Sequence, residues 1–177
     1  MYHHVQPFIS KSSQMNYNEQ YQAYREILFN LLDSPIKSTQ HIGGTKHFNY
    51  PTEPILDILV GVDNLHDITS LDEKRLNYAG FYRIHQPMYK KVLMAKFNNL
   101  TELKQTVRLH IIQRNTETFQ QYEALDALLT SNPMAIAQFK AFKTDISSTL
   151  SIREYENLKN EHFKICYTST NQINVTR

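Results

Sequence analysis

Residues 55–60, with the sequence ILDILV, constrain the fold more strongly than any other stretch of the chain. Successive side chains of a strand point to opposite faces, so Ile55, Asp57 and Leu59 share one face and the alternate residues share the other. Both faces are largely apolar, which is typical of a central strand covered on both sides. The rest of the chain must therefore cover both faces of a sheet.

Asp57 is the only charged residue in this strand, and burying its carboxylate should cost several kcal/mol unless it is paired or hydrogen-bonded. The side chains of Arg108 and His110 share one face of a strand predicted over residues 106–113, and this face is the best candidate partner. Two interpretations of Asp57 stay open. It is either a structural partner of nearby groups or a ligand for a metal or phosphate.

A pair of glycines, Gly43-Gly44, precedes this strand, and a loop joins the two. Glycine permits a positive φ or a close approach of the backbone to a ligand, so this turn is a candidate phosphate cradle. The alternative is a tight turn without a ligand. The chain contains neither the phosphate-loop motif nor a GxGxxG motif, so the turn by itself does not decide between them.

Helical and strand patterns alternate along the chain and predict an α+β fold. The fold expected is a mixed central sheet of about five strands, with an N-terminal helix and C-terminal helices packed on it. Helices are predicted over residues 17–31, 65–78, 119–129, 133–146 and 151–164, and strands over residues 37–42, 55–60, 81–85, 89–97 and 106–113. Tyr17, Tyr21 and Tyr24 lie on one stripe of the first helix and are interpreted as core aromatics, with a base-binding surface as the alternative.

The length of 177 residues suits a single domain over 1–177, with an irregular lead-in over 1–15 and a frayed polar tail over 166–177. With 19 basic and 17 acidic residues and no basic block, the chain has no strong nucleic-acid signal. No apolar run approaches the length of a membrane helix, and the N-terminus lacks the features of a signal peptide. A single cysteine, Cys166, suits a reducing compartment, so the expected location is cytoplasmic.

Several of these stretches resemble the GrpB family. The turn from His41 to Thr45, HIGGT, matches the family's His-Ile-Gly-Ser-Thr, and residues 53–60 match its Lys-Pro followed by Ile-Ile-Asp-Ile-Leu-Val at the same spacing. Arg108-Leu109-His110 corresponds to its His-x-His strand. Its helical motifs correspond to residues 133–143, with Phe139 in place of a tyrosine, and to residues 155–159. The resemblance covers most of residues 16–165 and implies a nucleotidyltransferase-like fold.

The chain also departs from the family pattern at several of these positions. Gly44 replaces a serine, Glu53 replaces a lysine, and Arg108 replaces the first histidine of the His-x-His strand. The Arg-Asp pair that usually precedes the helix beginning at Pro133 is Asp126-Ala127 here. These departures, one of which reverses a charge, argue against an active transferase.

Members of the nucleotidyltransferase superfamily hold magnesium with two carboxylates two residues apart on this strand, an arrangement suited to phosphoryl transfer. Here the residues two before and two after Asp57 are Ile55 and Leu59. Transfer chemistry would therefore need an acid recruited from elsewhere. The candidates considered are Glu102, Glu117 and Glu123.

The resemblance and the residues together favour a protein that binds a nucleotide or another small phosphorylated metabolite. The expected ligand-binding residues are His41, Gly43, Gly44, Thr45, Asp57, Arg108 and His110. Asp57 would hold Mg²⁺ or Mn²⁺. The alternatives are a non-catalytic protein-interaction domain, whose partner is unknown, and an active metal-dependent nucleotidyltransferase with a recruited acid.

Two further patterns are interpreted as structural. A zinc site built from His41, His47 and His110 with Asp57 is the weaker hypothesis, because no HExxH arrangement is present. The lysine pairs Lys90-Lys91 and Lys140/Lys143 are expected to be solvated.

Overall fold

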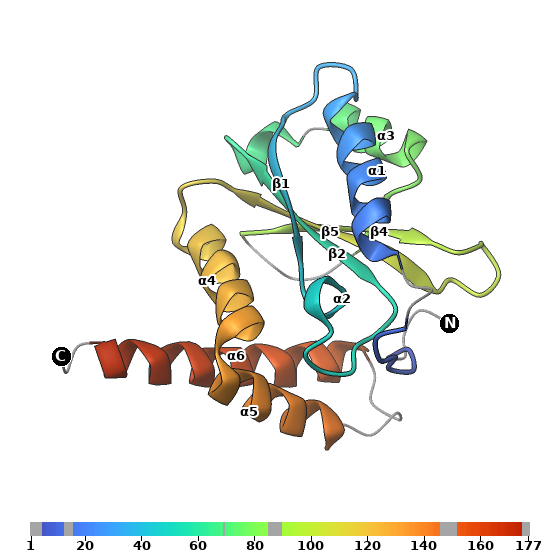
Figure 1. Ribbon diagram of the computed structural model, residues 1–177. Coiled ribbons are helices and arrows are strands. Elements are labelled where there is room, and N and C mark those ends of the chain that lie inside the picture. The colour runs from blue at the N-terminus through green and yellow to red at the C-terminus, as the bar shows by residue number, and fades with distance from the viewer. Residues whose placement is uncertain (1–4, 13–15, 69, 85–89, 146–151, 175–177) are drawn as a thin grey trace.

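The computed structural model describes residues 5–12, 16–68, 70–84, 90–145 and 152–174 (Figure 1). One sheet has the strand order β1-β2-β5-β4-β3. Its strands are β1 (Ile36–Ile42), β2 (Leu56–Val62), β3 (Tyr82–Arg83), β4 (Val92–Phe97) and β5 (Gln105–Gln113). β2 and β5 run parallel, and the other neighbouring strands run antiparallel. The expected α+β fold with a mixed five-stranded sheet is confirmed.

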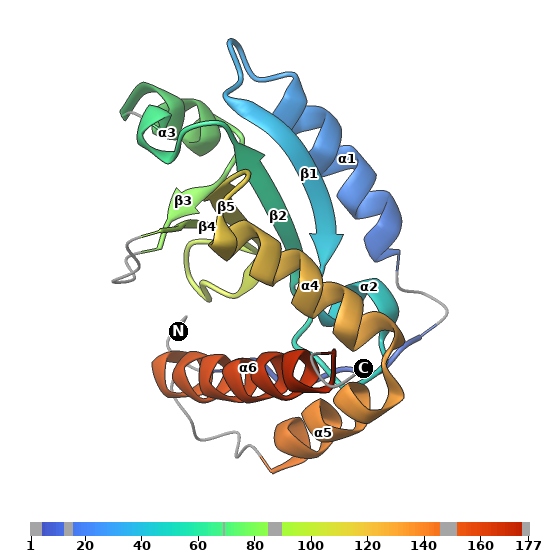
Figure 2. The ribbon, with the colours of Figure 1, turned by 90° about the vertical axis from the view of Figure 1, so that its left-hand side faces the viewer.

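Helices lie on both faces of this sheet. They are α1 (Tyr17–Phe29), α2 (Gly44–His47), the 3₁₀ helix η1 (Leu65–Asp67), α3 (Ser70–Tyr78), α4 (Glu117–Ser131), α5 (Pro133–Thr144) and α6 (Ile152–Asn174). Figure 2 shows α1 and α4 on opposite sides of β1 and β2, with α5 and α6 below the end of the sheet. The molecule therefore has a helix–sheet–helix arrangement, with two further helices at one end.

Local sequence explains where several helices begin. The side chains of Asn16, Thr116 and Asn132 accept hydrogen bonds from backbone N–H groups in the first turns of α1, α4 and α5. These groups have no partner within the helix, so a polar cap stabilises the helix start. Pro133 follows Asn132 at the first helical position, where its missing N–H costs nothing.

The main core lies between the sheet and helices α1 and α3. It contains Leu28 of α1, Leu76 of α3 and the side chains that β2 and β5 direct to this face, among them Leu56, Ile58, Val60, Val107, Leu109 and Ile111. Tyr17, Tyr21 and Tyr24 pack against the same core, and the ring of Tyr24 meets Phe81 edge-on. The interpretation of these tyrosines as core aromatics is therefore confirmed.

A smaller core lies on the opposite face, beneath α4. Leu59 of β2 packs there with Ile42 and Ile112, and Phe119 and Tyr122 of α4 cover them. Asp57 belongs to the same face of β2 as Leu59, so α4 is the helix that lies beside its carboxylate. This arrangement places the candidate site at the sheet face covered by α4.

The third cluster joins α4, α5 and α6 to the loop before β2. Its buried centre is Tyr50, Leu129, Ala135 and Phe139. Lys143 is buried here, which corrects the expectation of a solvated lysine, and its Nζ lies 4.8–6.0 Å from the ring centres of Phe8, Tyr50, Phe139 and Tyr155. Such cation–π contacts help to offset the cost of removing an ammonium group from water. Lys143 follows Phe139 by four residues, so helical spacing places both on one face.

Other elements differ from the sequence pattern. The helix predicted over residues 65–78 is divided into η1 and α3, and the side chain of Asn64 accepts the capping hydrogen bond of η1. Tyr78 is 95% exposed and contributes nothing to the core. The strand predicted over residues 81–85 is only two residues long, and the short helix α2 has too few residues for a periodic signal.

The ends of the chain also differ. Ile9, in the predicted lead-in, forms an antiparallel bridge with Thr52. α6 continues to Asn174, well past the predicted end at residue 164, so most of the predicted frayed tail is helical. Ser151, the first residue of the helix predicted over residues 151–164, lies outside the described residues. None of the described helices combines the length and apolar character that crossing a membrane requires.

We expect Phe139→Ala to lower the free energy of unfolding by about 3–5 kcal/mol, because truncating a fully buried aromatic ring leaves a cavity at the centre of the third cluster. Met134→Ala on the same helix is the matched control. Its side chain is exposed, so the change should stay within about 0.5 kcal/mol. Urea denaturation measures both, and equal losses would contradict the assigned packing of α5.

Candidate functional site

The glycine pair marks the turn between β1 and α2. Gly43 has a φ of 80°, a left-handed conformation that glycine adopts without strain. Gly44 is buried, and a Cβ on it would lie 2.5 Å from Cβ of Thr52. The glycine that replaces the family serine therefore allows the turn to approach the Thr52 segment closely.

Asp57 and His110 form the central pair of the site. Oδ1 of Asp57 lies 2.7 Å from Nε2 of His110, across the parallel pairing of β2 with β5. The Asp57 side chain is 23% exposed, so one edge of the carboxylate reaches solvent. Of the two partners expected for Asp57, His110 is the one in direct contact.

The protonation of this pair follows from its surroundings. Burial, together with the positive charge of Lys91, lowers the pKa of His110 to about 4, so the ring is neutral near pH 7. Burial acts to raise the pKa of Asp57, but the hydrogen bond from His110 and the charges of Arg108 and Lys159 hold that pKa below its ordinary range. Neutral His110 thus donates Nε2–H to an ionised carboxylate, and its buried Nδ1 has no hydrogen-bond partner among the described residues.

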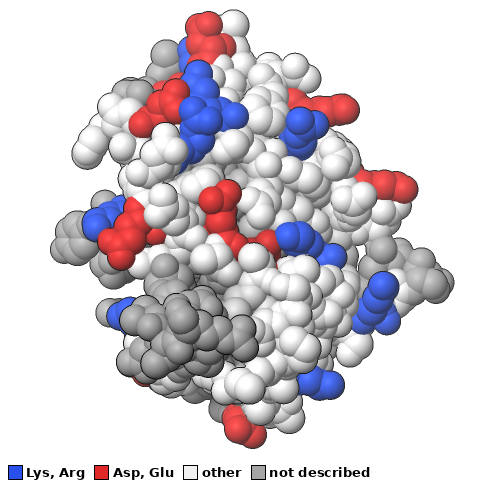
Figure 3. All heavy atoms as spheres, turned by 60° about the vertical axis from the view of Figure 1, so that its left-hand side comes forward, with Lys and Arg blue, Asp and Glu red and all other residues white. Residues whose placement is uncertain are grey.

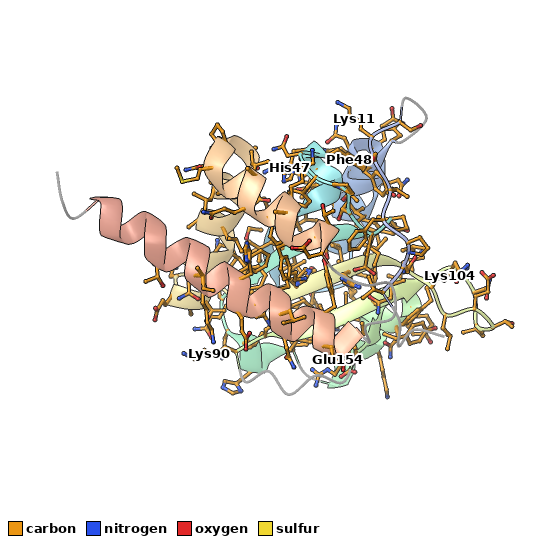
Figure 4. The ribbon with its side chains drawn as sticks, turned by 90° about the horizontal axis from the view of Figure 1, so that it is seen from below. Lys11, His47, Phe48, Lys90, Lys104 and Glu154 are labelled. Atoms are coloured by element: carbon orange, nitrogen blue, oxygen red, sulfur yellow. The ribbon has the colours of Figure 1, made fainter. Side chains whose placement is uncertain are left out.

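Two lysines and a tyrosine border this pair. Nζ of Lys91, beside the start of β4, donates a hydrogen bond of 2.7 Å to the hydroxyl of Tyr122 on α4, whose ring centre is 5.7 Å from that of His110. Lys159 acts electrostatically on both Asp57 and His110 from α6. Lys91 is half-buried, which corrects the prediction that Lys90 and Lys91 are both solvated. Lys90 is exposed, and Figure 4 shows it on the opposite side of α6 from His47.

His41 and Thr45 form a second buried pair, next to the turn. Oγ1 of Thr45 donates to the carbonyl oxygen of Ile55 at 3.2 Å and lies 3.1 Å from Nε2 of His41. A hydroxyl group has one proton, so Nε2 of His41 must donate to it. Burial lowers the pKa of His41 to about 4, and the ring of Tyr21 stacks on it. Both polar side chains are therefore engaged in holding the turn.

Asp126 of α4 is a site residue that the sequence pattern does not identify. Its Oδ1 accepts a 3.1 Å hydrogen bond from the backbone N–H of Gly43, and its Oδ2 pairs with Nζ of Lys46. Asp57 Oδ2 lies on another side of the same glycine, 3.2 Å from the position of a Cβ. Two carboxylates thus meet at Gly43, from segments far apart in the sequence.

Two departures from the family pattern are in contact with each other. Glu53 and Arg108 are both buried, and Oε1 of Glu53 lies 3.6 Å from Nη2 of Arg108. Gln105 accepts a hydrogen bond from Nε of Arg108, and Oε2 of Glu53 accepts one from the backbone N–H of Gln6. The two changes of residue type therefore compensate for each other in charge, which neither position reveals alone.

The structure brings together all seven predicted site residues, but it uses most of their polar groups internally. The Gly43 amide binds Asp126, the Thr45 hydroxyl binds Ile55, and Arg108 binds Glu53. The acids proposed for recruitment lie elsewhere. Glu102 is in the β4–β5 turn with Asn98 and Asn99, Glu117 opens α4, and Glu123 borders a separate cavity.

The residues around Asp57 do not form a metal site by themselves. Among the described residues, no three His, Cys, Asp or Glu side chains come together as ligands. Oδ1 of Asp57 is taken by His110, which leaves Oδ2 as the atom able to contact a cation. Mg²⁺ commonly binds through one or two carboxylates plus the phosphates of a substrate, so an ion here would need oxygens from a bound ligand.

We expect Glu53→Gln to cost about 3–5 kcal/mol of stability, because it removes the buried negative charge that lies 3.6 Å from the guanidinium of Arg108. Combining Glu53→Leu with Arg108→Met should recover most of that loss, since it removes both charges. The exposed pair Lys104–Glu102 is the control, where Lys104→Met should cost less than about 1 kcal/mol. If a double-mutant cycle measured by urea denaturation gave no coupling energy between Glu53 and Arg108, the interaction between the two side chains would be contradicted.

Stability should fall as the pH drops from about 6.5 to about 4, because the unfolded chain protonates His41 and His110 in this range while the folded chain keeps them neutral. The unfolded state then binds more protons, at a cost on the order of 3 kcal/mol for each histidine. His110→Gln, whose amide can still donate to Asp57, should flatten the dependence. His66→Gln, at an exposed position, should not. Urea titrations at several pH values measure these slopes.

Comparison with known proteins identifies the family of this chain. The family model for GrpB protein matches residues 9–169. "Glutamate-rich protein GrpB" of Alkalihalophilus pseudofirmus is 26% identical over 133 residues, which cover 75% of this chain and 76% of that protein. The crystal structure of conserved protein GrpB from Enterococcus faecalis has a TM-score of 0.66 at 21% identity and covers 90% of this chain and 99% of its own, which shows a shared fold.

A cytoplasmic RNA terminal U-transferase is similar over a smaller part. The match has a TM-score of 0.41 at 19% identity and covers 72% of this chain and 40% of the transferase chain. Nothing about activity follows from a likeness of that extent. The family model, in contrast, spans nearly the whole chain. This protein belongs to the GrpB family.

Proposed function

We propose that this protein binds a small phosphorylated ligand, of the nucleotide or phosphorylated-metabolite class, beside the Asp57–His110 pair. The observation that carries the proposal is the set of charges around that pair: a partly exposed carboxylate lies in the field of Arg108, Lys91 and Lys159. Glu53 already compensates the charge of Arg108, so Lys91 and Lys159 are the cations that favour an anionic ligand, and positioned cations are the usual partners of phosphate oxygens.

The ligand contacts expected from the sequence change, because the Gly43 amide and the Thr45 hydroxyl already have partners within the protein. Lys91, which directly precedes β4, and Lys159 of α6 take the role of phosphate partners in the proposal, since both act electrostatically on His110. Oδ2 of Asp57 contacts either a hydroxyl group of the ligand or a Mg²⁺ or Mn²⁺ ion carried by its phosphates. The glycine turn then shapes the wall of the site.

Binding is favoured over nucleotidyl transfer by the position of the second carboxylate. Asp126 meets Gly43 from α4, but Lys46 is paired with it. A transfer reaction that used both acids to hold metal ions would have to release this lysine first. On the face shown in Figure 3, acidic and basic side chains of the described residues are interspersed, which suits a small ligand better than a long polyanion.

Thermal melting against nucleotides and coenzyme precursors, with and without Mg²⁺ or Mn²⁺, tests the proposal. A ligand at 100 times its Kd should add roughly 2.7 kcal/mol, which corresponds to a shift of about 2–4 °C. Lys91→Met and Lys159→Met should each reduce the shift, because each removes a proposed phosphate partner. Their matched controls are Lys90→Met and Lys164→Met, which change exposed neighbours and should leave the shift intact.

Asp57→Asn separates the roles of the carboxylate. It should abolish any part of the shift that depends on the metal ion. If no ligand raises the melting temperature and Asp57→Asn only lowers the baseline, the carboxylate is structural. That result would overturn the binding proposal and favour a non-catalytic interaction domain.

A further inference from the structure

A separate cavity lies between β1, the β5–α4 connection and the first turns of α4. Its volume is about 330 Å³, and Leu59 and Phe119 form its apolar wall. At about 30 Å³ per water molecule, it has room for roughly ten waters or a ligand of about a dozen heavy atoms. None of the residues that line it belongs to the Asp57 site, so it is a distinct feature of the molecule.

The close approach of two strands and a loop forms one side of this cavity. A Cβ at Gly61 would lie 2.2 Å from Oγ of Ser38 and 2.7 Å from Cγ of Arg114, two residues that line the cavity. Asn115, the next lining residue, has a φ of 59°, a left-handed conformation that asparagine tolerates. The absence of a side chain at Gly61 and the turn at Asn115 thus shape the cavity.

Thr39 and Arg114 are bonded to Tyr21 and Asp63, but the other five polar side chains of the cavity have no hydrogen-bond partner within the described part of the chain. They are a hydroxyl, three amides and a carboxylate, from Ser38, Gln40, Asn115, Gln120 and Glu123. Polar groups that converge on a concave site next to an apolar wall are typical of small-molecule pockets. Each amide both donates and accepts hydrogen bonds, so the set is suited to a ligand with many hydroxyl groups.

The charges disfavour a phosphorylated ligand in this cavity. Arg114 is its only lining cation among the described residues, and its Nε and Nη2 both donate to Oδ1 of Asp63. The carboxylate of Glu123 faces the same space and favours a donor or a positive charge. The cavity therefore selects the opposite charge from the Asp57 site.

We propose that this cavity is a second binding site, for a neutral or positively charged, hydroxyl-rich molecule about the size of a monosaccharide. The proposal is independent of ligand binding at Asp57, because the two sites share no residue. Glucosamine, glucose and glucose 6-phosphate are suitable probes. They have the same ring size, and they are respectively positive, neutral and negative.

Ligand-observed NMR with the full chain tests the proposal at millimolar probe concentrations. Glucosamine should bind more tightly than glucose, and glucose 6-phosphate should not bind in this cavity. Glu123→Gln should remove the advantage of glucosamine while glucose still binds. Gln120→Ala should weaken both sugars several-fold.

Gln121→Ala is the matched control, because Gln121 is the adjacent exposed amide on α4, bonds to Glu117 and does not line the cavity. Circular dichroism of each variant confirms that the fold is retained. Failure of glucosamine and glucose to bind would overturn the proposal. So would tighter binding of glucose 6-phosphate that Gln120→Ala weakens, since that binding would be in the cavity and not at Asp57, or an equal effect of Gln120→Ala and Gln121→Ala.

Discussion

β2 is hydrogen-bonded on both edges and buried on both faces, and the arrangement of the other elements follows from this. Its apolar side chains on one face require the cover of α1 and α3, and those on the other require α4. The same burial makes the charged carboxylate of Asp57 destabilising unless a neighbouring group compensates for its charge. His110 supplies that compensation because the parallel pairing of β2 with β5 brings the two side chains to one face.

The site illustrates how one constraint recurs in several places. Every buried charge around the glycine turn has a specific partner: Asp57 has His110, Glu53 has Arg108, and Asp126 has Lys46 and the Gly43 amide. A buried polar group without a partner carries the full cost of its dehydration, which favours networks in which most groups are paired, and Nδ1 of His110 is an exception here. Groups that the sequence analysis assigns to ligand binding are thus partly committed to the fold.

α4 links the two candidate binding regions. Its Tyr122 and Asp126 border the Asp57 site, while its Phe119, Gln120 and Glu123 border the cavity beside β1. Residues on successive turns of one helix can therefore serve ligands of opposite charge. The positive field near Lys91 and Lys159 and the carboxylate of Glu123 give the two regions opposite electrostatic preferences.

The sequence by itself determined the elements whose signals are local. The apolar pattern of residues 55–60 identified the central strand, and the tyrosine stripe of α1 and the Asn132-Pro133 start of α5 identified helices, because periodicity and capping act over a few residues. It also placed Asp57 and His110 in one site. Tertiary structure alone decided that Lys143 is buried, that Glu53 pairs with Arg108, and that Asp126 reaches Gly43. These contacts join segments far apart in the chain, and charge compensation across such distances leaves no pattern within any single stretch of sequence.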